Sequence, residues 1–252
     1  MNEDDTPLPR YDYQAGAVLL VDKPKDWTSF DVVNKIRHKL KKRLKVKKIK
    51  VGHAGTLDPM ATGLLIICTG KATKTIQTYQ DQPKVYTGTM TLGATTPSFD
   101  AETAVDAEFP IDHIDEDLID RARQQFLGTI QQVPPMFSAI KVDGQPLYKR
   151  ARKGETIQVE PREVHMYEFE ITRVELPEID FRVRCSKGTY IRALANDFGK
   201  ALDSGAYLTA LRRTAIGDYK VEDAWQLDKL VKHIKEGAVM KSEIGSRKSE
   251  GN

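Results

Sequence analysis

One short segment of the chain concentrates residues that could carry chemistry. It runs from Gly52 to Gly63 as Gly-His-Ala-Gly-Thr-Leu-Asp-Pro-Met-Ala-Thr-Gly, and His53 and Asp58 are its only ionisable residues. The glycines and the proline restrict the backbone to a tight path, so the segment is either a plain turn with Asp58-Pro59 at its corner or a loop that presents Asp58 in a cleft. A carboxylate presented in this way can act as a nucleophile or as a base, and a nearby cation would keep it ionised and oriented.

A second segment could supply that cation. Residues 185–192 read Cys-Ser-Lys-Gly-Thr-Tyr-Ile-Arg, which predicts the end of a strand, a turn, and a helix that Thr189 can cap. Arg192 then lies one turn into the helix, where its planar guanidinium either holds a carboxylate through two hydrogen bonds or forms an ordinary surface ion pair. Tyr86 and Tyr190 are either core aromatics or platforms on which a base can stack.

The familiar motifs for phosphate, cofactor and metal binding are missing from the sequence. Gly63 to Ala72 resembles a phosphate-binding loop, but six residues separate its glycines and an alanine stands where a metal-binding hydroxyl is needed. The chain has no dinucleotide fingerprint, no Cys-x-x-Cys, no His-Glu-x-x-His and no Gly-x-Ser-x-Gly, and its five histidines are scattered. We therefore expect neither a cofactor nor a metal, and chemistry carried by ordinary side chains.

The net charge of +3 conceals an uneven distribution of charge. Residues 35–50 contain ten Lys or Arg and no acid, whereas residues 100–120 contain nine acids and no Lys or Arg. A basic run of this kind is either a solvated face or a surface for a polyanion. Nucleic acid is the commonest polyanion that such a surface binds, because each neutralised phosphate releases condensed counterions.

Composition and patterning place the chain among ordinary globular proteins. It has 252 residues, of which 40% are hydrophobic and 30% charged, and no apolar run approaches the length of a membrane span. The acidic N-terminus does not resemble a signal peptide, and Cys68 and Cys185 are expected to be buried thiols. These features predict a cytoplasmic protein that is not inserted in a membrane. No apolar helix face is left over, so we expect a monomer.

The order of predicted elements favours an α+β fold. Thr28 and Asp31 can cap a helix over residues 30–44, and the other elements mix strands and helices without a regular βαβ alternation. We expect a largely antiparallel sheet flanked by helices. The predicted strands cover 17–22, 64–68, 85–92, 164–185 (two or three strands) and 207–216, and further helices cover 71–79, 116–126, 147–153 and 189–202. Residues 16–232 are expected to form one catalytic domain between a flexible tail at 1–15 and a polar tail at 233–252.

Several segments, in order along the chain, together resemble the TruB family of bacterial tRNA pseudouridine synthases. The ensemble spans about residues 16–228 and is more specific than any single segment. The matching segments are 20–24 (Leu-Val-Asp-Lys-Pro), 53–65 (His-Ala-Gly-Thr-Leu-Asp-Pro-Met-Ala-Thr-Gly-Leu-Leu), 70–74 (Gly-Lys-Ala-Thr-Lys), 84–86 (Lys-Val-Tyr), 134–141 (Pro-Pro-Met-Phe-Ser-Ala-Ile-Lys), 185–192 and 207–213 (Tyr-Leu-Thr-Ala-Leu-Arg-Arg).

The resemblance implies a pseudouridine synthase fold and a specific reaction. The C1′–N1 bond of a uridine in RNA would break, the uracil would turn, and C5 would be joined to C1′; the target would be the T-loop uridine at position 55 of tRNA. Asp58 matches the family's catalytic aspartate, Arg192 the arginine that pairs with it, and Tyr86 the tyrosine that stacks on the target base. Whether the aspartate attacks the sugar or relays a proton stays open.

Five further residues match substrate-binding positions of the family. His53 matches the residue that helps hold the T-loop with its base flipped out, Tyr190 and Leu211 match positions that line the uracil pocket, and Lys23 and Lys187 match basic residues near the site. An extruded base needs such an aromatic platform and a basic surface around it.

The chain departs from the family pattern in two places. Thr96-Pro97-Ser98 stands where many members have Thr-Asp-Thr, which leaves the role of the acidic segment open, and we expect no C-terminal RNA-binding domain of the PUA type. The basic residues in 149–153 are expected to belong to a flap that clamps RNA. Two rival functions are an RNA-binding module without catalysis, which would not need both Asp58 and Arg192, and hydrolytic removal of a base, which would release uracil.

Overall fold

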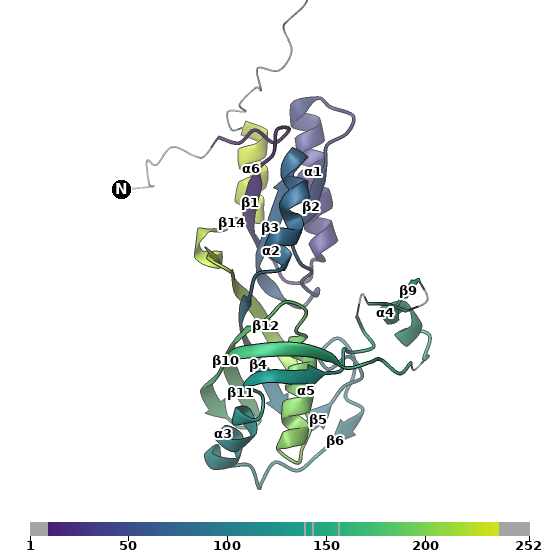
Figure 1. The fold of residues 1–252 in the computed structure, drawn as a ribbon, viewed down its shortest axis with the longest axis vertical. Helices are drawn as coiled ribbons and strands as arrows, with labels where there is room; N and C mark the ends of the chain where they lie inside the picture. The colour runs from purple at the N-terminus through teal and green to yellow at the C-terminus, as the bar shows by residue number, and fades with distance from the viewer. Residues whose placement is uncertain (1–9, 139, 143, 156, 237–252) are drawn as a thin grey trace, which may run out of the picture. The chain divides into compact units, whose positions relative to one another are not determined.

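The computed structural model describes residues 10–138, 140–142, 144–155 and 157–236 (Figure 1). These residues form two compact units, one made of residues up to 59 with 63–80 and the chain from 219 onward, the other of residues 60–62 and 81–218. Residues of the segment 16–232, for which we predict one catalytic domain, occur in both units. No helix in the described part of the chain combines the length and the apolar character that a membrane crossing requires.

The first unit is a small sheet against which two longer helices pack (Figure 1). Strand β1 pairs antiparallel with β3 and parallel with β14, and β2 pairs antiparallel with β3. The apolar run that predicted a strand at 64–68 is completely buried, as expected for a strand with neighbours on both sides. The elements of this unit are β1 (Val18–Lys23), α1 (Ser29–Leu44), β2 (Val51–His53), β3 (Thr62–Thr69), the 3-10 helix η1 (Gly70–Thr75), α2 (Ile76–Gln80), β13 (Tyr219–Lys220), η2 (Val221–Asp223), β14 (Trp225–Gln226) and α6 (Leu227–Glu236).

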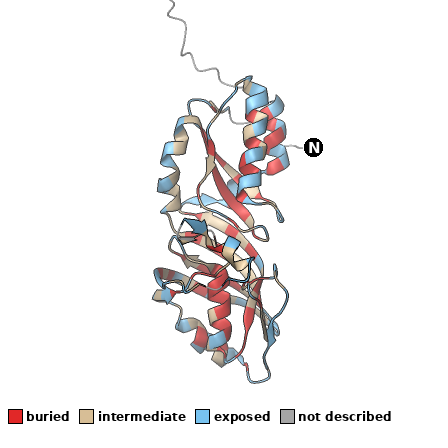
Figure 2. Ribbon diagram, turned by 90° about the vertical axis from the view of Figure 1, so that its right-hand side faces the viewer, coloured by how far each residue is buried: buried red, intermediate tan, exposed pale blue. Residues whose placement is uncertain are grey.

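Helix α1 forms as its sequence predicts. The Thr28 hydroxyl accepts a hydrogen bond from the Asp31 backbone amide at 3.0 Å, and the Asp31 carboxylate accepts one from the Thr28 amide at 3.0 Å, which completes a capping box. The helix ends where Lys45 adopts a left-handed conformation. Its apolar side, with Ile36 and Leu40 fully buried, joins the same hydrophobic core as α6. Figure 2 shows a buried and an exposed side on these helices.

Five consecutive antiparallel strands form the core of the second unit. The strand order is β12-β4-β11-β10-β7, and every neighbouring pair is antiparallel. Together with the first unit, this arrangement confirms the α+β class and the largely antiparallel pairing. The elements are β4 (Lys84–Leu92), β5 (Ala94–Thr95), β6 (Ala107–Glu108), α3 (Glu116–Gln124), β7 (Gly128–Gln132), β8 (Lys141–Val142), β9 (Gln145–Pro146), α4 (Leu147–Ala151), β10 (Arg162–Glu175), β11 (Glu178–Cys185), α5 (Ile191–Ala201) and β12 (Ala206–Ile216).

An aromatic cluster fixes α5 against this sheet. Phe169 of β10 lies 5.5 Å from Phe198 of α5 and 6.2 Å from Phe181 of β11, measured between ring centroids. Both pairs are edge-to-face, the arrangement that the charge distribution of aromatic rings favours. Because the three rings are almost completely buried, they anchor the helix that carries Arg192.

The structure differs from the sequence expectations at both ends of the described chain. The expected N-terminal tail is ordered from residue 10: Tyr13 is 3% exposed and belongs to the core, and the Asp12 carboxylate accepts hydrogen bonds from the amides of Gln14 and Ala15. Helix α6 continues to Glu236 and buries Ile234, so it extends four positions into the segment expected to be a polar tail. Residues 1–9 and 237–252 lie outside the described residues.

Candidate active site

The loop that carries Asp58 is fixed at the start of α1. The Ser29 hydroxyl accepts a hydrogen bond from the Leu57 amide at 2.8 Å and donates one to the Leu57 carbonyl at 3.2 Å. Gly55 has a φ of +104°, a conformation that a residue with a Cβ rarely adopts. Asp58 follows directly after Leu57 and is half-buried. The segment is thus a structured loop, and Asp58 on it is partly exposed.

Lys23 also holds this loop in place. Its side chain is completely buried at the end of β1, and Nζ donates to the carbonyls of Pro24 (3.0 Å), Trp27 (2.6 Å) and Pro59 (3.3 Å). The ammonium therefore replaces the hydration of three backbone oxygens, one of them in the residue after Asp58. This geometry makes Lys23 a residue that positions the loop. His53, at the end of β2, is half-buried and pairs with Ile67 in the sheet.

Tyr86 and Leu211 lie on one face of the second unit's sheet. Tyr86 pairs with Arg213 across β4 and β12, and Leu211 pairs with Gly88 two residues further along. Side chains of paired residues share a face, and residues two apart on a strand share it as well. A Cβ at Gly88 would lie 2.5 Å from the Ala210 carbonyl, so only glycine fits there. Tyr86 and Leu211 therefore lie on the same face of the sheet.

The N-terminus of α5 differs from the expected cap. Thr189 does not cap the helix, because its hydroxyl donates to the Ser186 carbonyl at 2.9 Å and Tyr190 occupies the N-cap position without a side-chain hydrogen bond to the helix. The side chain of Gln132, on β7, holds the backbone of Tyr190 at this position. It donates a hydrogen bond to the Tyr190 carbonyl at 3.0 Å and accepts one from the Tyr190 amide at 2.8 Å. Lys187 is exposed and forms an ion pair with Asp81 at 2.7 Å.

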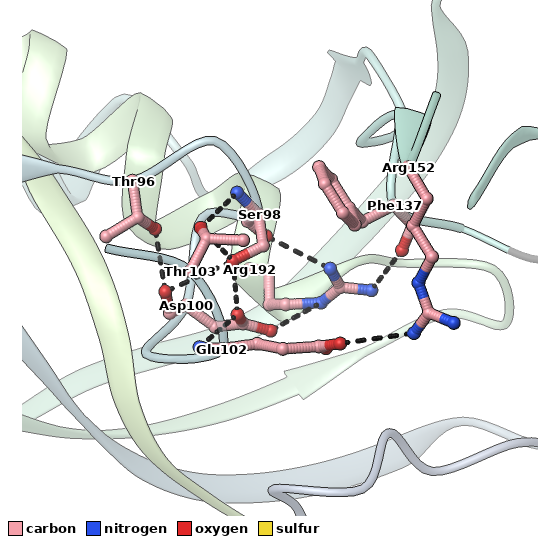
Figure 3. Close-up of polar contacts among 8 residues, drawn as sticks. All are labelled: Thr96, Ser98, Asp100, Glu102, Thr103, Phe137, Arg152 and Arg192. Atoms are coloured by element: carbon pink, nitrogen blue, oxygen red, sulfur yellow. Dashed lines mark hydrogen bonds and ion pairs between the residues drawn. The ribbon is translucent and has the colours of Figure 1, made fainter. Parts of the chain in front are cut away.

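Arg192 is a buried residue at the centre of a polar network. The residue is 3% exposed, and its guanidinium donates to the carbonyls of Ser98 (3.0 Å) and Phe137 (2.8 Å) and places Nε 3.4 Å from an oxygen of Asp100 (Figure 3). The alternative that Arg192 forms an ordinary surface ion pair is therefore wrong. Three segments that are far apart in the sequence meet at this one side chain.

Asp100 is the functional candidate that the sequence interpretation missed. It is 1% exposed, and its Oδ1 accepts from the Ser98 hydroxyl at 2.6 Å and from the Glu102 amide at 2.9 Å (Figure 3). The acidic segment 100–120 thus begins with a carboxylate that faces Arg192. The departure from the family pattern at Thr96-Pro97-Ser98 leaves the role of this segment open. Nothing in the spacing of its acids indicates that Asp100 is the one that pairs with Arg192.

Glu102 connects this network to the predicted flap. It is exposed and lies 3.4 Å from Arg152, which follows α4 (Figure 3). Arg152 also lies over the ring of Tyr148, with 5.6 Å between its guanidinium carbon and the ring centroid. Arg150 donates to the Val142 carbonyl at 3.3 Å. The basic segment therefore folds as a short helix whose cations remain at or near the surface.

Burial shifts the pKa values of three side chains on the strands, those of Lys84, Cys185 and Cys68. It lowers the pKa of Lys84 to about 8, with a smaller contribution from repulsion by Arg213, and raises the pKa of the Cys185 thiol to about 11. Burial also raises the pKa of Cys68 to about 11. The two cysteines are buried, as predicted, and stay protonated at neutral pH, which excludes both as nucleophiles. Among the described residues, no group of three His, Cys, Asp or Glu could hold a metal ion.

Two models of known protein families match the chain. Residues 41–191 match the model of the N-terminal domain of TruB family pseudouridylate synthases, and residues 192–243 match that of the tRNA pseudouridylate synthase B C-terminal domain. The chain belongs to the TruB family. The first match covers His53, Asp58 and Tyr86, and the second begins at Arg192 and includes Leu211.

Relatives with curated names support the TruB assignment. The chain is 61% identical over 214 residues to tRNA pseudouridine synthase B of Flavobacterium johnsoniae, covering 84% of this chain and 93% of that protein. It is 56% identical over 216 residues to tRNA pseudouridine synthase B of Phocaeicola vulgatus, covering 86% of this chain and 92% of that protein.

Solved structures show the same fold. A chain from the crystal structure of a Cbf5-Nop10-Gar1 complex superposes with a TM-score of 0.66 at 32% identity; the match covers 88% of this chain and 55% of that one. A chain from the structure of an H/ACA ribonucleoprotein bound to a substrate RNA containing 2′-deoxyuridine gives a TM-score of 0.62 at 28% identity, covering 91% of this chain and 61% of that one. This TruB chain therefore has the fold of a pseudouridine synthase, as expected.

Proposed function

We propose that this TruB protein converts the T-loop uridine at position 55 of tRNA to pseudouridine. The observation that carries the proposal is membership of the TruB family, together with 61% identity to a tRNA pseudouridine synthase B. The reaction is an isomerisation: the C1′–N1 bond breaks, a C1′–C5 bond forms, the proton at C5 is lost and N1 gains one. No net oxidation or reduction occurs, so ordinary side chains suffice.

Asp58 is the proposed catalytic residue, acting as nucleophile at C1′ or as a base. Its carboxylate is half-buried on a loop fixed by Ser29 and Lys23, and a carboxylate is suited to either role at an anomeric carbon. Arg192 is the proposed cationic partner of Asp58. Its side chain is already oriented by Asp100, Ser98 and Phe137, which reduces the entropy lost when it binds a second carboxylate.

In this proposal, the other residues that match substrate-binding positions of the family serve substrate binding. A uridine must leave its stack before C1′ can be reached, and Tyr86 provides the ring on which the flipped base stacks. Tyr190 and Leu211 line the uracil pocket, His53 holds the T-loop with its base extruded, and Lys187 contributes positive charge beside the RNA. Lys23, with its ammonium occupied by carbonyls, supports the loop from within.

The test is to incubate the protein with an unmodified tRNA transcript and to map pseudouridine at nucleotide resolution. The proposal predicts one modified position, the T-loop uridine at position 55, and no free uracil. An RNA-binding module without catalysis would leave the transcript unmodified, and a base-removing hydrolase would release uracil and leave an abasic site. Modification only at positions outside the T-loop would show that the proposed target is wrong.

A further inference from the structure

The most basic surface of the first unit is not used by the chemistry proposed above. Outward-facing cations run along α1 and its C-terminal extension and continue on α6, where Lys229, Lys232 and Lys235 are exposed. The acids on these helices are fewer: Asp31 belongs to the α1 cap, and Asp228 and Glu236 lie on α6. The positive charge of 35–50 is thus extended by a second helix, which the sequence alone did not indicate.

Four of these lysines lie close enough to repel one another. Repulsion by Lys235 of α6 lowers the pKa of Lys39, followed by burial of Lys39 and by repulsion from Lys35 and Lys42 of α1. Lys35, Lys39 and Lys42 are spaced four and three residues apart, so they line one side of α1. The side chain of Lys35 lies over the Trp27 ring, with 5.9 Å between Nζ and the ring centroid. We call this group of four side chains the lysine face.

The lysine face leads away from the catalytic loop. Helix α1 begins at Ser29, which is hydrogen-bonded to Leu57 beside Asp58. At about 1.5 Å per residue, Lys35, Lys39 and Lys42 lie roughly 9, 15 and 20 Å along the helix axis from Ser29. From Lys35 to Lys42 the face spans roughly 10 Å, a length over which a duplex with one phosphate every ~1.7 Å of its axis carries about six phosphates, counted over both strands.

We propose that the lysine face binds the phosphate backbone of the helical stem that continues from the RNA loop whose uridine reaches Asp58. This inference rests on the proposed function, because it takes the substrate to be a hairpin of tRNA. Lysines act as point charges that contact phosphates without reading bases. The guanidinium of Arg37, in contrast, donates to the Asn34 side chain and the Val51 carbonyl. We therefore do not count Arg37 as part of the lysine face. The face therefore contributes affinity and orientation, and sequence selection occurs at the loop.

The proposal predicts that the effect of the lysines depends on the length of the stem. The test variant combines Lys39→Gln, Lys42→Gln and Lys235→Gln. Two hairpin RNAs with the same loop are compared, one with a stem of about ten base pairs and one with about three, because about 20 Å corresponds to roughly six base pairs at ~3.4 Å each. Binding is measured by fluorescence anisotropy from about 50 to 200 mM salt, the range over which phosphate contacts weaken most visibly.

For the long hairpin, the variant should bind roughly 3- to 100-fold more weakly. This range is obtained when three charge contacts are lost and each contributes about 0.2–1 kcal/mol. The slope of log K against log salt should fall by about 0.7 to 0.9 for each phosphate that the variant no longer neutralises. For the short hairpin, affinity should change less than about twofold. A control variant carries the same change in charge at other exposed positions: Arg121→Gln, Lys200→Gln and Lys220→Gln. It should bind both hairpins like the wild-type protein.

Three results would overturn the proposal: an unchanged slope, an equal loss of affinity on both hairpins, or an equal loss of affinity in the control variant. An alternative is that the lysine face binds acidic residues of a second copy of the protein. Sedimentation of the protein alone at low salt tests this alternative. A dimer formed by the wild-type protein but not by the variant would favour it and reject the proposal that the face binds RNA. Pseudouridine formation by the wild-type protein on both hairpins is scored separately. Its absence would reject the proposed function while leaving the comparison of affinities interpretable.

Discussion

Replacing Asp100 by asparagine should destabilise the protein and slow the reaction. Asp100 is 1% exposed and lies 3.4 Å from the buried Arg192 guanidinium. Removing one partner of a buried ion pair costs about 3–5 kcal/mol, because the other charge stays buried without compensation. The asparagine oxygen can still accept hydrogen bonds from Ser98 and Glu102, as the aspartate does now. We therefore expect a decrease in stability near the lower end of that range, about 3 kcal/mol.

Urea unfolding at pH 7 measures this change in the free energy of unfolding. Glu102→Gln is the matched control, since Glu102 is two residues away and its ion pair with Arg152 is exposed, with side chains 44% and 65% accessible. An exposed pair contributes less than about 1 kcal/mol. Both substitutions remove one negative charge. The difference between their changes in the free energy of unfolding therefore measures the effect of burying the ion pair.

The same pair of variants separates positioning from substrate binding. Because Asp100 orients Arg192 and does not itself touch the uridine in our account, Asp100→Asn should lower kcat with little change in KM. The ion pair between Asp100 and Arg192, at 3.4 Å, should contribute no more to catalysis than its loss costs in stability, about 3 kcal/mol, which corresponds to a decrease in kcat of up to roughly 150-fold. If Asp100→Asn unfolds within about 0.5 kcal/mol of the wild-type protein and keeps its kcat, the network in Figure 3 does not hold Arg192.

Three further predictions follow from single features of the structure. Lys23→Met should lower the free energy of unfolding by about 1–3 kcal/mol, because the buried ammonium of Lys23 no longer donates to the carbonyls of Pro24, Trp27 and Pro59; urea titration checks this, and unchanged stability would argue against it. Lys84 has a pKa of about 8 when folded against 10.5 unfolded, so the unfolded chain binds more protons between these values and stability rises with pH. Between about pH 7.5 and 9, the wild-type protein should gain about 1 kcal/mol relative to Lys84→Met in chemical unfolding, and a constant difference would refute the assignment. Truncating the basic side chains of 149–153 together should weaken tRNA binding with a shallower salt dependence; an equal slope would show that the flap makes no phosphate contacts.

Local elements of the fold could be predicted from the sequence because their causes are local. The Thr28–Asp31 cap and the apolar spacing of α1 lie within one segment, and the helix begins and ends close to where they indicate. Local motifs singled out Asp58 and Arg192, whereas the resemblance to the TruB family assigned roles to His53, Lys23, Lys187 and Leu211. Thr189 shows the limit of this reasoning, since a threonine beside a turn can bond to the turn itself instead of the helix.

The contacts that orient the site could not be predicted, because they join distant parts of the chain. Arg192 and Ser98 are 94 residues apart, and Gln132 and Tyr190 are 58 apart. Only the fold of the second unit brings these side chains together. A buried arginine must find partners for its charge, but the sequence offers nine acids between residues 100 and 120 and does not indicate which of them is buried.

The most direct test of the central claim is the Asp58→Asn variant, assayed on unmodified tRNA for both binding and pseudouridine formation. Asparagine keeps the size and shape of the side chain and removes the charge that the reaction needs. The account predicts tRNA affinity within about threefold of wild type and a turnover rate reduced by at least ~10⁴-fold, the scale expected on removing a catalytic nucleophile or base. Turnover at a rate comparable to that of the wild-type protein would contradict it.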